Sequence, residues 1–205
     1  MAAPQLTWQS SLFGADAPAA DALFSGVVRH ELDGRSWVEH QAGWLAGADE
    51  VFAALVDHAR WDQHTRPMYG ERVLQPRLTA RWRDDAQLAE RVPVLEEMRR
   101  LLTDRYGRDF DTGGLNLYRD GRDSVAWHGD RIPEELREPV VAIVSVGEPR
   151  RFLLRPKGGG RSRRFELGAG DLLVTGGRCQ REWQHSVPKV AAAGPRISIT
   201  FRHSA

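Results

Sequence analysis

The sequence predicts a mainly β protein of the α+β class, in which an antiparallel sandwich or barrel carries helices packed on one side. Two observations support this prediction. Apolar side chains recur at helical spacing only in the first half of the chain, whereas from Leu115 onward they alternate with polar ones, as in short strands. Glycine-containing turn signals interrupt that second half at residues 120–121, 158–160, 168–170 and 176–177.

Two helices are expected in the first half. The first follows Asp49, a candidate N-cap, and its apolar stripe consists of Phe52, Leu55, Val56 and Ala59. The second begins near Pro93 and ends near Gly107, with a stripe of Leu95, Met98 and Leu102. Residues 68–82 are predicted to be irregular with strand character, and residues 26–30 and 36–38 to be short strand-like pieces without chemistry.

Composition limits the class of protein. Hydrophobic residues make up 41% of the 205 residues and charged residues 28%, which is typical of a folded, soluble domain. No apolar run approaches the roughly 20 residues that span a bilayer, and the first residues lack the pattern of a secretion signal, so we expect a cytoplasmic protein. Cys179 is the only cysteine, which excludes an intramolecular disulfide and a thiolate-rich metal site.

Side chains two apart on a strand share a face, which allows the polar residues of the later strands to be sorted. Asn116 and Tyr118 share one face of their strand, and the last strand carries Arg196, Ser198, Thr200 and Arg202 on one face. A surface strand shows the same alternation. The pattern that departs from it is the pair His128 and Asp130, with His185 farther along the chain.

Two histidines and one carboxylate are the ligand set of the facial triad of non-heme iron(II) oxygenases. Such ligands can occupy one face of an octahedron and leave three positions open for a bidentate co-substrate and dioxygen. A His-x-Asp pair alone is weak evidence, because a surface strand pair is its usual explanation. Arg196 adds to it, since an arginine facing the interior needs an anion. That anion is either the carboxylate of a bound diacid or an internal Asp or Glu.

Four segments, in the correct order, resemble the AlkB family of iron(II)- and 2-oxoglutarate-dependent dioxygenases. Residues 112–130 resemble its Asn-x-Tyr segment followed by His-x-Asp, and residues 183–189 resemble the segment with its second histidine. Residues 195–202 are similar to its closing Arg-x-Asn-x-Thr-Phe-Arg. Residues 75–80, Gln-Pro-Arg-Leu-Thr-Ala, are similar to the animal homologues that act on single-stranded nucleic acid. The resemblance extends from about Pro67 to the C-terminus.

This resemblance implies a double-stranded β-helix, or jelly roll, with helices packed on one sheet. It implies that iron(II) is bound by His128, Asp130 and His185, and that 2-oxoglutarate is held by Asn116, Tyr118, Arg196 and Arg202. Dioxygen is the other co-substrate. The implied reaction oxidatively removes methyl groups from nucleobases of DNA or RNA, as in alkylation repair, and releases formaldehyde, succinate and carbon dioxide.

The substrate side leaves alternatives open. A base must be single-stranded or flipped out to be reached, and Tyr69 and Trp82 are candidates either to stack on it or to pack in the core, whereas core packing is favoured for Trp127. After the His-x-Asp, the chain has Arg131, which is a further candidate substrate contact, and Ile132, where nucleobase-repairing members of the family carry acidic residues. An oxygenase acting on a protein, lipid or small molecule is therefore an alternative, and a non-catalytic jelly roll that binds nucleic acid is another.

We expect a single domain: residues 1–60 as an N-terminal extension, 61–110 as a substrate-side segment and helix, and 111–205 as the catalytic jelly-roll core. The net charge of +1 does not indicate a nucleic-acid partner. A basic run around the glycine hairpin is either a phosphate-binding track or a solvated hairpin; it consists of Arg150, Arg151, Arg155, Lys157, Arg161, Arg163 and Arg164. A monomer without membrane contact or an obligate protein partner is expected. No role is assigned to His30, His40, His58, His64 or His203.

Overall fold

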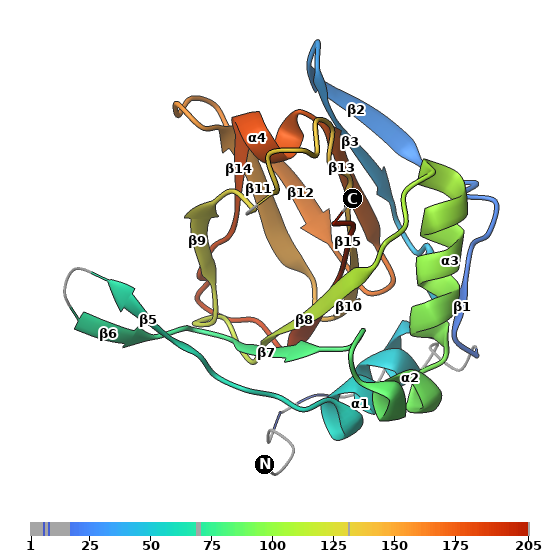
Figure 1. The fold of residues 1–205 in the computed structure, drawn as a ribbon. Helices are drawn as coiled ribbons and strands as arrows, with labels where there is room; N and C mark the ends of the chain where they lie inside the picture. The colour runs from blue at the N-terminus through green and yellow to red at the C-terminus, as the bar shows by residue number, and fades with distance from the viewer. Residues whose placement is uncertain (1–5, 7, 9–16, 69–70, 131, 205) are drawn as a thin grey trace.

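Two antiparallel sheets face each other in this computed structural model, which describes residues 6, 8, 17–68, 71–130 and 132–204. The larger sheet has seven strands in the order β2-β3-β13-β10-β15-β8-β7, and the smaller sheet has four in the order β12-β11-β14-β9. Viewed along the barrel, the sheets enclose a central space, and helices α1, α2 and α3 gather outside the larger sheet (Figure 1).

Eight consecutive strands, β8 to β15, are divided between the two sheets. Strands β8, β10, β13 and β15 lie in the larger sheet, whereas β9, β11, β12 and β14 make up the smaller one. This arrangement confirms the predicted jelly roll. The strands are β8 (Thr112–Tyr118), β9 (Val125–His128), β10 (Val141–Gly147), β11 (Arg150–Pro156), β12 (Arg163–Leu167), β13 (Leu172–Gly177), β14 (Trp183–Val187) and β15 (Arg196–Arg202), with the short helix α4 (Cys179–Glu182) between β13 and β14.

Both helices expected from the sequence are present, as α1 (Ala48–His58) and α3 (Val94–Tyr106). The predicted exit of α3 is confirmed, because Gly107 adopts the left-handed conformation, with a φ of 62°, that commonly ends a helix. The N-cap predicted for α1 is wrong. Gly47 takes that position, and Asp49 lies in the first helical turn, where a negative charge favours the helix dipole.

A third helix, α2 (Ala86–Arg91), was not predicted from apolar spacing. It is a short helix that buries only Leu88 among its own residues, so a periodic stripe has no room to develop. Its start is nevertheless encoded locally, because the side chain of Asp85 accepts a hydrogen bond of 3.1 Å from the backbone amide of Leu88.

The two faces of the larger sheet have opposite characters. The outer face packs against the helices and buries a continuous apolar cluster that includes Phe52 and Leu55 from α1, Leu95, Met98 and Leu102 from α3, and Leu115, Leu117, Ile197, Ile199 and Phe201 from the strands. The inner face carries the alternate residues of the same strands, including Asn116, Tyr118, Ser198 and Thr200, which line the space between the sheets. The predicted sorting of side chains by face is confirmed.

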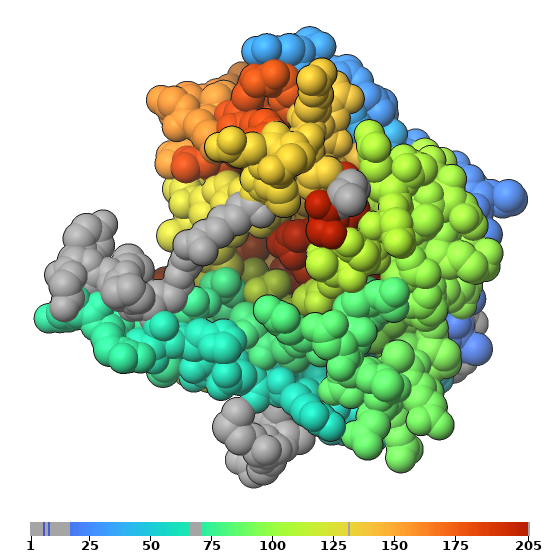
Figure 2. All heavy atoms as spheres, viewed as in Figure 1, coloured from blue at the N-terminus to red at the C-terminus, as the bar shows by residue number. Residues whose placement is uncertain are grey.

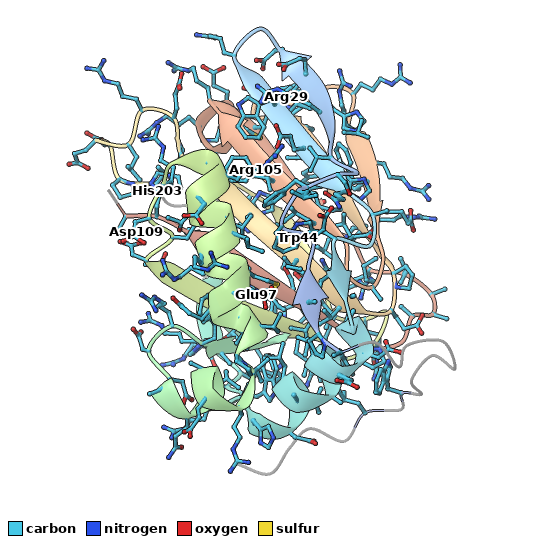
Figure 3. All side chains as sticks on the ribbon, turned by 90° about the vertical axis from the view of Figure 1, so that its right-hand side faces the viewer. Arg29, Trp44, Glu97, Arg105, Asp109 and His203 are labelled. Carbon is cyan, nitrogen blue, oxygen red and sulfur yellow. The ribbon has the colours of Figure 1, made fainter. Side chains whose placement is uncertain are left out.

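The N-terminal strands belong to the same sheet system. β2 (Val28–Asp33) and β3 (Ser36–Gln41) extend the larger sheet beyond β13, and β1 (Ala19–Ala20) pairs with β4 (Leu45–Ala46). The buried Glu39 of β3 forms ion pairs with Arg29 at 3.3 Å and with Arg105 of α3 at 3.4 Å. Figure 3 shows these two arginines on the side of the molecule where α3 lies across the sheet. The N-terminal strands therefore help to fix α3.

The segment of residues 68–82, predicted to be irregular with strand character, contains the last residue of one short strand and two further short strands. β5 (Thr65–Met68) and β6 (Glu71–Leu74) form a separate hairpin that projects beside the open end of the barrel, and β7 (Leu78–Arg81) forms the edge of the larger sheet next to β8 (Figure 1). The helices in the described part of the chain are too short or too polar to span a bilayer.

Candidate active site

A cavity of about 170 Å³ lies between the two sheets, at the open end of the barrel. Its walls come from β8, β10 and β15 of the larger sheet and from β9, β11 and β14 of the smaller one. In the space-filling view the centre of this face is hollowed, and atoms of the C-terminal strand are visible at its floor (Figure 2). The cavity is lined by all seven of the residues predicted to bind iron and 2-oxoglutarate, namely His128, Asp130, His185, Asn116, Tyr118, Arg196 and Arg202.

The three predicted metal ligands converge. His128 ends β9 and is the direct cross-strand neighbour of His185 on β14, so strand pairing itself sets the two imidazoles side by side, with ring centroids 4.2 Å apart. Asp130 follows two residues after His128. Each residue offers one ligand atom, and these atoms all lie within 4.8 Å of one another. Two imidazoles and one carboxylate at this spacing suit an iron(II) ion with open positions.

Both imidazoles are oriented by their surroundings. The Nδ1 atom of His128 lies 2.9 Å from the backbone carbonyl oxygen of Ala126, which fixes the ring and leaves Nε2 available as a ligand atom. The ring of His185 stacks on Phe152 at a centroid distance of 5.3 Å. Burial lowers the pKa of His185 from 6.5 to about 4. The ring is therefore neutral at neutral pH, which is the state that binds a metal.

Asp130 has one satisfied and one unsatisfied carboxylate oxygen. Burial alone would raise its pKa, but the Arg202 guanidinium and the two imidazoles bring the pKa below its ordinary value. Oδ1 accepts a hydrogen bond of 3.2 Å from Arg202. Oδ2 is buried and has no hydrogen-bond partner among the residues that the structure describes. A buried carboxylate oxygen without a partner is costly, and a metal ion held with the two histidines would satisfy it.

Arg196 is fully buried and is also incompletely satisfied. Its Nε donates a hydrogen bond of 2.8 Å to Ser145 Oγ, and its guanidinium carbon lies 5.4 Å from the centroid of the Tyr118 ring. Nη2 is buried without a hydrogen-bond partner in the described residues, and none of their carboxylates lies within ion-pair distance. Burial lowers its pKa to about 10, so the group stays charged at neutral pH. The alternative of an internal ion pair is therefore not supported, and the geometry fits the distal carboxylate of a diacid.

The remaining predicted co-substrate residues also carry internal contacts. The side-chain oxygen of Asn116 accepts a hydrogen bond of 2.9 Å from Arg77 Nε, and Arg202 donates one of 2.9 Å to Thr200 Oγ1. Sequence reasoning missed Ser145 and Gln180, which also line the barrel or its cavity. Ser145 sits within a continuous buried strand, β10, so no alternation marked it.

Comparison with known proteins decides the family. Residues 46–202 match the model of the 2OG-Fe(II) oxygenase superfamily. The chain belongs to this superfamily. The match begins upstream of Pro67, where the sequence resemblance was expected to start, and therefore also includes α1 and β5.

Two relatives place this 2OG-Fe(II) oxygenase next to AlkB proteins, which confirms the resemblance seen in the sequence. It is 34% identical to the alpha-ketoglutarate-dependent dioxygenase alkB homolog 3 of Bos taurus, over 77% of this chain and 62% of the relative. It is 32% identical to the DNA oxidative demethylase ALKBH2 of Arabidopsis thaliana, over 74% of this chain and 60% of the relative. The chain thus spans about three fifths of the length of these relatives.

A solved structure supports the fold. A prolyl hydroxylase of Trichoplax adhaerens, in complex with a hypoxia inducible factor peptide, superposes on the oxygenase with a TM-score of 0.60. The two chains share 13% identity, over 82% of this chain and 83% of the hydroxylase. At this identity the likeness concerns the fold alone.

Among the described residues, the structure does not place a predicted substrate residue in the cavity of the metal ligands. Trp82 is 1% exposed, and its indole packs against Phe201 and donates a hydrogen bond of 3.4 Å to the Thr200 carbonyl. Of the two alternatives left open for Trp82, the structure therefore favours core packing over stacking on a base. Tyr69 and Arg131 lie outside the described residues. Trp127 is half-buried rather than in the core, and its ring lies 4.1 Å from the Arg155 guanidinium carbon.

The basic run divides into buried and exposed members. Arg150 is 2% exposed and donates hydrogen bonds of 3.1, 2.8 and 2.9 Å to the carbonyls of Asp120, Asp123 and Pro188. Arg150 therefore ties the ends of β8 and β14 to β11 and is unsuited to contact a phosphate backbone. Arg151 and Arg164 lie near Glu166, at 4.0 and 2.6 Å. A cationic surface is left to the other members, Arg155, Lys157, Arg161 and Arg163.

Proposed function

We propose that this protein is an iron(II)- and 2-oxoglutarate-dependent oxidative demethylase of N-alkylated nucleobases in DNA or RNA. The observation that carries the proposal is that one cavity contains both a buried carboxylate oxygen and a buried guanidinium nitrogen without hydrogen-bond partners in the described structure. Asp130 Oδ2 and Arg196 Nη2 are both buried without a partner in the described structure, and both line the same space. A metal ion would satisfy the first, and a diacid that chelates this ion would satisfy the second.

Each residue of the cavity then has a defined task. The iron, held by His128, Asp130 and His185, supplies the oxidising chemistry with dioxygen and 2-oxoglutarate when it is bound. Arg202 holds Asp130 in place through the 3.2 Å hydrogen bond and keeps it ionised. Arg196, itself oriented by Ser145, holds the distal carboxylate of the co-substrate. No side chain is required as a general base.

The nucleobase substrate is inferred from the AlkB relatives and from the charge near the cavity. A base inside a duplex is out of reach, so the substrate is single-stranded or flipped. Lys157 lies beside the ligand set. The Cε atom of Lys157 is 3.3 Å from the position that a Cβ atom would occupy at Gly129. Together with Arg155 on Trp127, this places two cations and an aromatic ring along the edge of β9, a combination suited to a nucleic-acid strand.

The proposal is tested by incubating the protein with iron(II), 2-oxoglutarate and a methylated oligonucleotide, and measuring succinate, formaldehyde and base restoration. Release of formaldehyde with restored base supports it. The assay is repeated with single-stranded and double-stranded DNA and RNA. If succinate forms but the base is restored in none of them, the result would instead favour an oxygenase of a protein, lipid or small molecule. Absence of turnover with retained oligonucleotide binding would favour a non-catalytic binding module.

A further inference from the structure

We infer that Asp62, on the segment between α1 and β5, recognises the substrate base and selects bases that carry a positive charge. This inference rests on the proposed function and adds to it a residue that selects the substrate. Neither the AlkB-like motifs nor the predicted site included this aspartate.

Strand pairing places Asp62 at the end of a polar row that crosses the floor of the barrel. Asp62 and Thr79 exchange two backbone hydrogen bonds, of 2.9 and 2.8 Å, so the segment before β5 adds one more rung to the larger sheet. Direct cross-strand neighbours share a face. Across β10, β15, β8 and β7 that row consists of Ser145, Ser198, Asn116, Thr79 and finally Asp62. The row thus leads from the partner of Arg196 to Asp62.

The outer end of this row lines a second hollow, of about 430 Å³, that continues the catalytic cavity. The two spaces share Asn116, Thr200 and Arg202 as common walls. A volume of this size lies in the usual range of small-molecule sites, roughly 300 to 1,000 Å³. A base that enters through this hollow reaches the cavity of the metal ligands along the polar row. In Figure 1 the segment that follows α1 passes below β7 on its way to β5.

Asp62 provides the available negative charge in these joined spaces. Asp62 and Asp130 are the carboxylates that line them in the described part of the chain, and Asp130 is engaged by Arg202. The cations of the hollow are partly neutralised, because Arg60 pairs with Asp85 at 3.6 Å and Arg81 with Asp84 at 3.5 Å. The Asp62 side chain is 58% exposed; its Oδ2 lies 3.4 Å from His64 Nδ1, and its Oδ1 accepts a hydrogen bond of 2.8 Å from the Gln63 backbone amide. Asp62 is thus accessible to a ligand that enters the hollow.

The chemistry of the substrate gives this carboxylate a task. Methylation of adenine at N1 or of cytosine at N3 produces a base that is cationic at neutral pH and keeps an exocyclic amino donor. A carboxylate both accepts from that amino group and complements the charge, whereas an amide does only the first. The positions directly after Asp130, Arg131 and Ile132, provide no carboxylate for this purpose.

The test compares Asp62→Asn with wild type on two oligonucleotides of one sequence, containing either 1-methyladenine, which is cationic, or N6-methyladenine, which is neutral. We expect the variant to lose roughly tenfold in kcat/KM and in affinity for the cationic oligonucleotide, as for one charged hydrogen bond, and less than about twofold for the neutral one. Affinity is measured by fluorescence anisotropy with manganese(II) and 2-oxoglutarate, without turnover. Asp57→Asn, an exposed aspartate on α1, is the matched control for loss of one charge.

The outcomes separate this inference from the proposed function. Unchanged preference for the cationic base in Asp62→Asn, with an unchanged melting temperature, would overturn the role of Asp62. An equal loss of affinity in Asp57→Asn would show a general effect of protein charge and would also overturn the specific role of Asp62. If the wild-type protein demethylates neither oligonucleotide, the proposed demethylase activity is overturned. The ratio of the two binding affinities, compared between wild type and Asp62→Asn, still decides whether Asp62 distinguishes a cationic base from a neutral one.

Discussion

The two faces of the larger sheet are built from alternate residues of the same strands, yet the two faces have different roles. The outer face of β8 and β15 presents Leu115, Leu117, Ile197 and Ile199 to the helices, and each is at most 1% exposed. The inner face presents Asn116, Ser198 and Arg196 to a cavity in which two buried polar atoms, Asp130 Oδ2 and Arg196 Nη2, have no partner among the described residues. The helix-side face therefore stabilises the fold, whereas the inner face keeps polar groups available for a ligand at a cost in stability.

Two buried arginines repeat this contrast on a smaller scale. Arg150 donates to three backbone carbonyls that belong to the loops after β8 and β14. Arg196 donates a hydrogen bond to Ser145, lies beside the Tyr118 ring, and has a buried Nη2 without a partner among the described residues. Burial of a guanidinium therefore does not by itself indicate function. Each of the two arginines has one buried nitrogen without a partner among the described residues, Nε in Arg150 and Nη2 in Arg196. What distinguishes Arg196 is that it lines the cavity of the predicted metal ligands, whereas Arg150 does not.

The largest effect is expected from Asp130→Ala. Removal of this carboxylate should reduce turnover below detection, because two imidazoles alone do not complete the ligand set. The free energy of unfolding should change little in the metal-free protein, since one oxygen of the lost carboxylate was already unsatisfied. Succinate formation and urea denaturation measure the two quantities. Normal turnover in this variant would remove Asp130 from the ligand set.

On the opposite face, Leu102→Ala should destabilise the protein without touching the cavity. Leu102 is fully buried in the cluster between α3 and the sheet. Loss of its side chain should cost about 2 to 5 kcal/mol in the free energy of unfolding. Below the melting temperature of the variant, the KM for 2-oxoglutarate should stay within about twofold of wild type. A large rise in the KM for 2-oxoglutarate under conditions where the variant is fully folded would show that the outer and inner faces of the sheet are coupled.

Arg196→Met should separate co-substrate binding from folding. The KM for 2-oxoglutarate should rise by roughly 10- to 100-fold, the equivalent of losing a charge-assisted contact. Stability should be retained or raised, because a buried charge without an anion is replaced by an apolar chain of similar length. Arg150→Met is the control: it should lower stability, since three carbonyls lose their donor. An unaltered KM in Arg196→Met would contradict the assigned role.

The last prediction concerns the pH dependence of the stability of the metal-free protein. The pKa of His185 falls from 6.5 in the unfolded chain to about 4 in the folded protein. Between these values the unfolded state binds a proton that the native state does not, so stability is full above pH 6.5 and falls as the pH drops toward 4. Urea midpoints at several pH values should show a weaker decline in His185→Gln. Equal declines would assign the effect to other groups.

Most of the site could be predicted because strands make local spacing informative and because the motifs resemble those of the AlkB family, which implied the roles of the individual residues. The alternation along β8 and β15 indicated which side chains share a face, and His-x-Asp placed two ligands at one strand end. The meeting of His128 with His185 depends on the pairing of β9 with β14, which spacing does not specify. Trp82 shows the limit in the other direction: its sequence neighbours suggested a loop, whereas the contact with Phe201 that buries it is long-range.

The contributions of the N-terminal part were not predictable in the same way. Strand β3 joins the larger sheet by pairing with β13, more than a hundred residues later, and β2 pairs with β3. Asp62 joins the polar row through its pairing with Thr79, and nothing in the residues around it marks this pairing. A role for such a residue becomes visible only when the register of the sheet is known.

The most direct test is an anaerobic titration of the visible charge-transfer absorption that an iron(II)–2-oxo acid chelate produces. In wild type we expect the absorption to appear only when iron(II) and 2-oxoglutarate are both present. It should be absent in Asp130→Ala, and in Arg196→Met it should require at least about tenfold more 2-oxoglutarate. Equal titration curves for all three proteins would contradict the joint binding of metal and diacid in this cavity.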